Sequence, residues 1–168
     1  MNRRIFISAG LALVGFVRLA WAQLSDPSSS VRYASLTRPV RIPIDSVATP
    51  WKPVAFVADG RFREKRVLMN GVLLRTDTAL SALCVTCPHE QCHVDLVTDE
   101  ARLARMVEGK ASNPLFECGC HFSVFDAARE GARLSGESPR GLYRFRINAI
   151  REGVVEITEI EEAALGEV

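Results

Sequence analysis

The sequence predicts a mostly β protein: a small antiparallel sandwich or barrel with one short inserted helix. Three observations favour this class. Short runs rich in β-branched residues recur from about residue 39, apolar and polar side chains alternate near the C-terminus, and a single stretch has helical periodicity. With 168 residues, the chain can form one domain with a substantial core but not two full catalytic domains.

The expected strands of the first half follow one another along the chain. Residues 40–44 and 54–57 are rich in β-forming side chains. The stretch VLMNGVLL (67–74) places the pair Asn70-Gly71 between two apolar runs, which predicts a hairpin turn at that pair. Residues 79–85 form another apolar run, which leads directly into a cluster of cysteines.

The second half adds a hairpin, a helix and a tail. In residues 143–147 apolar side chains alternate with arginines, and residues 154–158 follow the pair Glu152-Gly153, which predicts a hairpin. Residues 98–107 (TDEARLARMV) have a Thr or Asp cap and apolar side chains at i, i+3 and i+4, which predicts the inserted helix. The acidic residues 161–168 are interpreted as a frayed tail.

The N-terminal residues 1–24 are not part of this domain. The pair Arg3-Arg4 precedes an apolar run that ends in Ala20-Trp21-Ala22, a small-x-small cleavage pattern. The segment resembles a twin-arginine export signal, a route for proteins that fold before they cross the membrane. A plain signal peptide is the alternative. Removal by cleavage and retention as an N-terminal membrane anchor both remain open.

A tether and the folded domain are expected after the export segment. Residues 25–38, which include the stretch SDPSSS, are interpreted as a flexible tether, and residues 39–160 as the domain. The export segment implies the periplasmic face of a bacterial inner membrane as the location, with the protein either anchored there or released. The formal net charge of +1 gives no electrostatic reason to propose nucleic acid as a partner.

Two short clusters carry the chemistry of the chain. The stretches CPHEQC (87–92) and CGCHFS (118–123) contain four of the five cysteines and two of the three histidines. One zinc ion could be held by the four residues Cys87, His89, Cys118 and His121. That set leaves Cys92 and Cys120 unexplained, although free thiols oxidise in exported proteins. A four-cysteine zinc site that includes Cys84 is a further possibility.

The two clusters fit the motifs C-x-H-x-x-C and C-x-C-H-x-S at all six cysteine and histidine positions, and in these the chain resembles the Rieske family. The resemblance implies a 2Fe-2S cluster in which Cys87 and Cys118 bind one iron and His89 and His121 bind the other. It also implies a Rieske-like sandwich or barrel with a cluster-binding subdomain.

Further residues gain a role only through this resemblance. It implies a disulfide between Cys92 and Cys120 that joins the two cluster loops. Ser123 matches a family serine that donates a hydrogen bond to a cluster sulfide. Phe125 stands where quinol-oxidising members usually have a tyrosine, whose hydroxyl is aimed at a ligand sulfur. Pro139 matches the proline of a loop that covers the cluster.

The chain also departs from the family pattern. There are 28 residues between His89 and Cys118, more than the family usually has, and they include the expected helix. The polar pair Glu90-Gln91 replaces the apolar residue and glycine found at the docking tip of quinol-oxidising members. Cys84 and His93 have no counterpart in the motifs. We expect Cys84 to be a buried apolar residue on the preceding strand and His93 to face solvent.

The resemblance implies a one-electron carrier with no other chemistry of its own. Rieske oxygenases and their ferredoxins usually lack the disulfide, and the chain is too short for an oxygenase's mononuclear-iron domain. We expect the iron–sulfur subunit of a cytochrome bc-type quinol:cytochrome c oxidoreductase, with cytochrome b, a c-type cytochrome and quinol as partners. The alternative is the electron-relay subunit of a periplasmic molybdenum oxidoreductase such as arsenite oxidase, because CHFSVFD (120–126) resembles that small subunit. A zinc-stabilised binding module is a third class.

Overall fold

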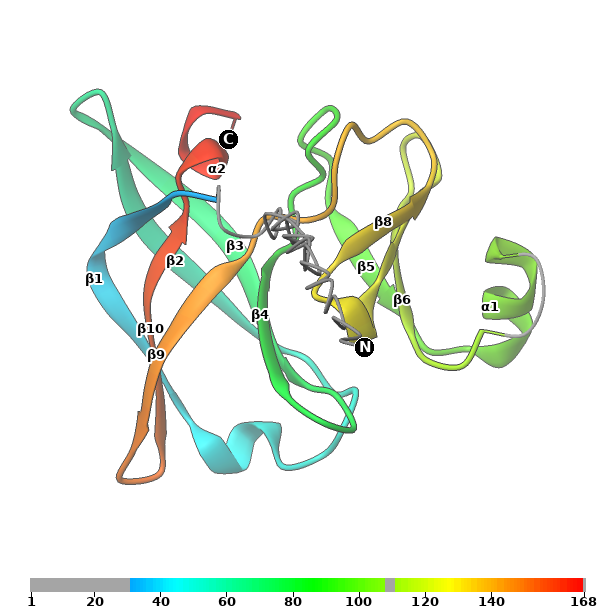
Figure 1. Cartoon of the computed structure of the whole chain (residues 1–168), viewed down its shortest axis with the longest axis horizontal. Helices are drawn as coiled ribbons and strands as arrows, with labels where there is room; N and C mark the ends of the chain where they lie inside the picture. Colours follow the sequence, from blue (N-terminus) through cyan, green and yellow to red (C-terminus); the bar gives the residue numbers. More distant parts are fainter. Residues whose placement is uncertain (1–30, 108–110, 168) are drawn as a thin grey trace, which may run out of the picture. The chain divides into compact units, whose positions relative to one another are not determined.

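A computed structural model describes residues 31–107 and 111–167 of the chain (Figure 1). The export segment or anchor expected at residues 1–24, and the first part of the expected tether, lie outside these described residues. Within them, no helix has the length and apolar character needed to cross a membrane.

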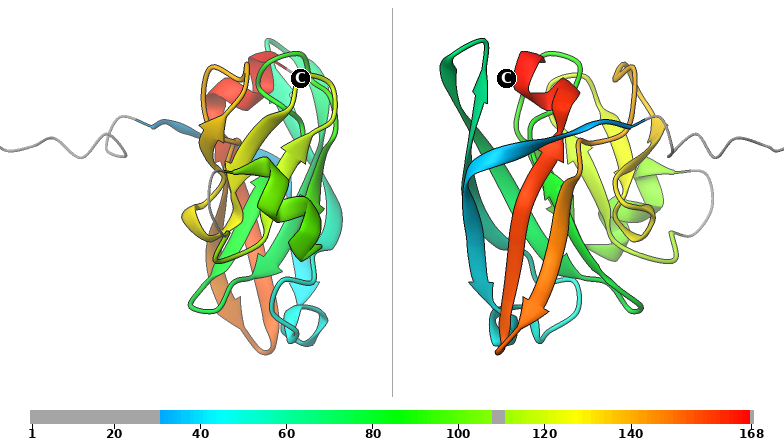
Figure 2. Two further views of the ribbon diagram at one scale, coloured as in Figure 1. Left: turned by 90° about the vertical axis from the view of Figure 1, so that its right-hand side faces the viewer. Right: turned by 60° about the vertical axis from the view of Figure 1, so that its left-hand side comes forward.

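The structure confirms the mostly β class, because strands and hairpins make up most of the described chain (Figures 1 and 2). Among the described residues the strands pair only antiparallel, in three sheets ordered β1-β10-β9, β2-β3-β4 and β5-β6-β7-β8. The strands of the first two sheets are β1 (Tyr33–Pro43), β2 (Val54–Phe62), β3 (Lys65–Arg75), β4 (Leu80–Cys84), β9 (Phe145–Arg151) and β10 (Val154–Glu161). The third sheet contains β5 (Val94–Val97), β6 (Leu115–Cys118), β7 (Ser123–Asp126) and β8 (Ala132–Ser135). Short 3-10 turns follow β1 and β7, at Ile44–Val47 and Ala127–Arg129.

Two main cores hold these sheets together. The first lies between β1-β10-β9 and β2-β3-β4, and its fully buried side chains include Met69, Leu73 and Ile157. The second lies under the four-stranded sheet and includes Phe116 and Phe125 together with the thiols that the sequence singled out. The four-stranded sheet therefore corresponds to the subdomain to which the family resemblance assigns cluster binding.

Asn70-Gly71 does not form the hairpin turn that the sequence predicted. Strand β3 runs straight through the pair, and the actual β2–β3 turn lies at Arg63-Glu64, where both residues have positive φ (46° and 66°). The glycine has a packing role instead. A Cβ on Gly71 would lie 2.4 Å from the Phe56 ring and 2.9 Å from the Phe145 ring, so only glycine lets these aromatic rings cross the strand.

The predicted C-terminal hairpin and inserted helix are both confirmed. Strands β9 and β10 are joined at Glu152-Gly153, where φ is 50° and 75°. Helix α1 (Glu100–Met106) begins after Asp99, whose side chain accepts a hydrogen bond from the Arg102 N–H at 2.8 Å. Its buried Leu103 packs against Val97 and other apolar side chains of the four-stranded sheet, so the insertion lies beside that sheet (Figure 1).

Both ends of the expected domain are longer than predicted. The tether prediction for residues 25–38 is wrong from Tyr33 onward, because β1 begins there and pairs with the end of β10. The prediction of a frayed tail at 161–168 is also wrong for residues 161–167, the part of that segment that the structure describes. Helix α2 (Glu162–Glu167) turns Ala164 and Leu165 into the first core, where they are 0% and 4% exposed. The acidic composition of this segment gave no sign of the short amphipathic helix.

Candidate metal centre

Two loops bring the predicted site residues together. The first connects β4 to β5, and its ends are tied by a Thr86–His93 bridge and by the Cys87 N–H, which donates to the Cys92 carbonyl at 2.8 Å. The second connects β6 to β7 and is closed where Cys118 pairs with Ser123. Because β5 and β6 are antiparallel neighbours and Val94 pairs with Cys118, the two loops project from the same end of the sheet.

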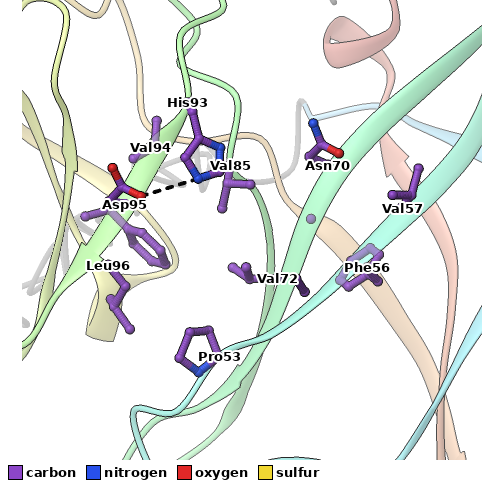
Figure 3. Close-up of a pocket in the computed structure, with 13 residues that line it drawn as sticks. Pro53, Phe56, Val57, Asn70, Val72, Val85, His93, Val94, Asp95 and Leu96 are labelled. Atoms are coloured by element: carbon purple, nitrogen blue, oxygen red, sulfur yellow. Dashed lines mark ion pairs between the residues drawn. The ribbon is translucent and has the colours of Figure 1, made fainter.

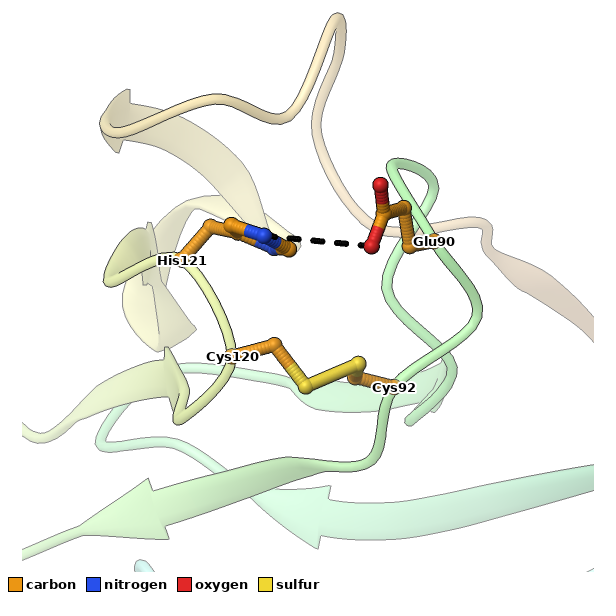
Figure 4. The surroundings of a disulfide bond; sticks show 4 residues. All are labelled: Glu90, Cys92, Cys120 and His121. Carbon is orange, nitrogen blue, oxygen red and sulfur yellow. Dashed lines mark ion pairs between the residues drawn. A yellow bond between two sulfur atoms is a disulfide. The ribbon is translucent and has the colours of Figure 1, made fainter.

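A disulfide joins the two loops, as the resemblance implied. Cys92 and Cys120 are bonded, with their Cα atoms 6.5 Å apart (Figure 4). This bond leaves three free cysteines in the described chain, Cys84, Cys87 and Cys118, all of them buried. Only the last two lie on the cluster loops, and Cys84 belongs to β4 and the first core, as expected.

Cys87 and Cys118 form a buried thiol pair, each 1% exposed. Burial raises the pKa of Cys87 above its ordinary value. The Cys118 thiol raises it further, whereas the His89 backbone and the Ser138 side chain act in the opposite direction. Two buried sulfurs in contact form thiolates readily only when a cation or a metal cluster compensates their charge, which makes this pair a natural metal-binding half-site.

His89 and His121 form the second half of the site, near the protein surface. Their rings meet edge to face, with centroids 4.7 Å apart. The His121 side chain is 40% exposed, and its Nε2 lies 3.8 Å from a Glu90 carboxylate oxygen. In Figure 4 the His121 ring and the Glu90 side chain point toward each other across the space between the loops. The imidazoles are therefore the donors that face solvent.

The donors thus lie in two separate groups. His89, Glu90 and His121 place ligand atoms within 4.8 Å of one another, as do Cys118 and the two disulfide sulfurs. In the part of the chain that the structure describes, no such group of three combines a thiol with an imidazole. The four ligand atoms around one zinc ion would lie within roughly 4 Å of one another. The separation suits two metal atoms, one with sulfur donors and one with nitrogen donors.

A third loop, residues 136–141, closes over the thiol side of the site. Ser123 is fully buried, and its Oγ accepts a hydrogen bond from the Ser138 N–H at 2.9 Å. Gly136 approaches even closer, because a Cβ there would lie 2.3 Å from the Ser123 Cα. Pro139, which the sequence singled out, is exposed on this loop. Ser138 was not among the predicted site residues, although its position next to Pro139 could have indicated that it lies near the site.

His93 faces solvent, as the sequence suggested. Its side chain is 63% exposed, and its Nε2 is 3.4 Å from an Asp95 carboxylate oxygen. The two residues border a groove of about 490 Å³ whose walls are mainly apolar and include Phe56, Val72 and Leu96 (Figure 3). Most of its lining residues belong to β2, β3, β5 and β6, and none of them is a predicted ligand.

Comparison with known proteins supports what the geometry indicates. The model of the Rieske [2Fe-2S] domain matches residues 50–146, which is more than half of the chain and includes both cluster loops. The chain belongs to the Rieske family. As a Rieske domain it binds a 2Fe-2S cluster and transfers electrons. No curated protein matches the chain.

Among solved structures, the Rieske chain is similar to the ferredoxin of carbazole 1,9a-dioxygenase from Nocardioides aromaticivorans IC177. The two are 22% identical, the match covers 72% of this chain and 97% of the ferredoxin, and the TM-score is 0.44.

The residues present fit the cluster that the family binds. A Rieske cluster needs two thiolates and two imidazoles, and the described site supplies a buried thiol pair and an imidazole pair that lie apart from each other. The other two loop cysteines, Cys92 and Cys120, are joined in the disulfide and so do not compete as metal ligands.

Proposed function

We propose that Cys87 and Cys118 hold one iron of the cluster and His89 and His121 hold the other. The grouping of the donors supports this assignment, because the thiols meet in the interior whereas the imidazoles meet near the surface. When bound, the cluster supplies a one-electron site whose potential is about −150 to +300 mV in this family. The exposed His121 edge gives that site its route to a partner.

We further propose that the protein is the iron–sulfur subunit of a quinol:cytochrome c oxidoreductase of the cytochrome bc type. The observation that carries this proposal is the Cys92–Cys120 disulfide, which locks the two loops beneath an exposed imidazole pair. Disulfide-containing Rieske proteins form the high-potential branch of the family. In this function His121 accepts a hydrogen bond from quinol at the surface, and an electron passes on to a c-type cytochrome.

The export segment supports a location at the periplasmic face of a bacterial inner membrane. Arg3-Arg4 and the apolar run after it resemble a twin-arginine signal, whose route accepts folded proteins. A protein that must acquire its cluster before export would use that route. Retention of the segment would anchor the subunit beside cytochrome b, and cleavage would release it.

A second candidate function, electron relay in a periplasmic molybdenum oxidoreductase, is favoured by two residues. The Glu90 carboxylate lies beside His121, where an apolar tip would suit a quinone pocket. Phe125 is fully buried and has no hydroxyl to raise the potential. Such a relay would take electrons from a catalytic molybdenum subunit and would not meet quinol.

EPR of the dithionite-reduced full-length protein, followed by redox titration over pH, tests these proposals. A rhombic signal with an average g below that of all-cysteine clusters is the expected result. In the quinol-linked function electron transfer is coupled to proton release, so the potential should be high and fall by up to about 59 mV per pH unit for each coupled proton. A markedly lower potential supports the molybdenum relay. Bound zinc with no EPR signal would refute the ligand assignment.

A further inference from the structure

Residues 136–141, here called the cover loop, contact both Ser123 at the start of β7 and Glu161 at the end of β10. At one end, Ser138 is 1% exposed, donates its N–H to Ser123 Oγ at 2.9 Å, and has its side chain beside the Cys87 thiol. The Ser138 hydroxyl donates to the Arg140 carbonyl at 2.8 Å. The conformation of the loop therefore decides where the Ser138 amide points.

The other end of the cover loop is held by Glu161. This carboxylate ends β10, is 1% exposed, and accepts hydrogen bonds from the guanidinium groups of both Arg140 and Arg144. The Arg140 guanidinium also lies over the Tyr143 ring, 4.3 Å from its centroid. A buried carboxylate is costly unless charged partners surround it, so Glu161 fixes Arg140 in one position.

The second arginine on Glu161 points away from the cover loop. Arg144 donates from Nε to Glu161 at 2.6 Å and from Nη1 to Glu130 at 3.0 Å. Burial alone would lower the pKa of Arg144, but its hydrogen bonds to Glu161 and Glu130 outweigh that effect and raise it. One carboxylate thus serves two functions that can be separated: Arg140 connects it to the cover loop, and Arg144 to the strand framework.

We propose that Glu161 is a positioning residue for the redox site, acting through Arg140 and the cover loop on Ser138 and Ser123. The inference rests on the ligand set proposed above, in which Cys87 holds an iron. Because the Ser138 amide occupies an acceptor position of Ser123 Oγ, it restricts how the Ser123 hydroxyl can turn toward the cluster. A hydrogen bond from that hydroxyl stabilises the reduced, more negative state.

Loss of the contact between Glu161 and Arg140 should therefore lower the midpoint potential. A hydrogen bond to a charged group contributes about 1.5 kcal/mol, so its loss changes the ratio of reduced to oxidised protein at a fixed ambient potential by up to about tenfold. For a one-electron couple this corresponds to a fall of about 59 mV. The backbone of the cover loop should also exchange its amide hydrogens faster.

The test compares E161Q and R140Q in the full-length, cluster-loaded protein. The charges of the two variants change in opposite directions, so a purely electrostatic effect would move their potentials apart: loss of a carboxylate raises the potential and loss of a guanidinium lowers it. Positioning lowers both. R144Q keeps the cover-loop contact and should reduce stability with a smaller change in potential. E159Q is the matched control, because Glu159 lies on the same strand and pairs with Arg146 at 2.7 Å outside the loop.

Redox titration and hydrogen exchange of residues 136–141 give the two readouts. Lower potentials and faster loop exchange in both E161Q and R140Q, with E159Q like wild type, are the expected result. Potentials that move apart, or loop exchange that equals wild type, overturn the proposal. If E161Q does not fold, loop exchange in R140Q decides, because a lower potential in R140Q is expected from either effect and Arg140 is 36% exposed. A wild-type protein that lacks the mixed-ligand EPR signal would refute the ligand set instead, and loop exchange would still decide whether Glu161 anchors the loop.

Discussion

Individual side chains give the two halves of the site different tasks. Cys87 and Cys118, the proposed thiolate ligands, are in the interior, where water is excluded, whereas His121 reaches the surface at the edge of the same loops. Phe125 is fully buried in the same cluster of side chains as the two thiols. A change at Phe125 can therefore alter the surroundings of the ligand sulfurs without touching the docking edge.

We predict that Phe125→Tyr raises the midpoint potential. In tyrosine-bearing relatives the hydroxyl is aimed at a ligand sulfur, and such a bond stabilises the reduced state by about 1.5 kcal/mol, or roughly 60 mV for one electron. Redox titration measures the effect. Phe116→Tyr is the control, because Phe116 is also buried and is paired with Phe125 across β6 and β7. An unchanged or lower potential in Phe125→Tyr would contradict the prediction.

At the scale of elements, the site depends on loops that a disulfide and a glycine hold in place. The Cys92–Cys120 bond joins the β4–β5 loop to the β6–β7 loop, and Gly136 lets the cover loop approach the Ser123 backbone. Neither constraint involves a ligand atom. Both can therefore be altered while the four donors remain.

We predict that Gly136→Ala is far more damaging than Gly153→Ala. Both glycines have positive φ (89° and 75°), so both substitutions carry the same kind of backbone strain. A Cβ at 136, however, would lie 2.3 Å and 2.7 Å from Ser123 backbone atoms, whereas at 153 the nearest atom outside the adjacent residues would be Ile44 Cγ2 at 3.9 Å. Denaturant unfolding should show an extra loss of about 1–3 kcal/mol for Gly136→Ala, with a lower potential. Equal losses of unfolding free energy in the two variants would show that the cover loop can move away from Ser123 at little cost.

We predict that the double variant Cys92→Ser, Cys120→Ser loses about 3–4 kcal/mol of unfolding free energy. The two cysteines are 28 positions apart, and the chain-entropy model assigns that stabilisation to closing a loop of this length. The four proposed ligands are unchanged, so the cluster-loaded variant should keep a mixed-ligand EPR signal. Chemical denaturation of the two cluster-free proteins measures the loss. A stability equal to wild type would mean that the strands alone hold the loops together.

At the scale of the whole molecule, the sequence predicted what local patterns encode. The ligand motifs, the β9–β10 hairpin and helix α1 each have their signal within a few neighbouring residues, and the structure has the disulfide, the hairpin and the helix where expected. Features that depend on distant packing were not predictable. Gly71 resembled a turn glycine because the Phe56 and Phe145 rings that require it come from other strands. Glu161 was assigned to a tail because its arginine partners lie on another segment.

The division into two main cores predicts that stability and redox potential can be changed separately. Leu165 of α2 is 4% exposed in the first core, whereas Cys87 and Cys118 belong to the second. Leu165→Ala should therefore reduce the unfolding free energy by about 2–5 kcal/mol and leave the midpoint potential unchanged. Denaturant unfolding and redox titration of the same samples measure the two effects.

The control for this change is Leu134→Ala, since Leu134 is 37% exposed on β8 and its truncation should alter stability by no more than about 0.5 kcal/mol. If Leu165→Ala shifted the potential, the first core would have to transmit its packing to the cluster loops. The Leu83–Arg144 bridge between β4 and the segment before β9 could carry such a coupling. Leu83 is in the second core, and Arg144 binds Glu161. An unchanged potential would confine control of the cluster to the second core and the Glu161–Arg140 contact.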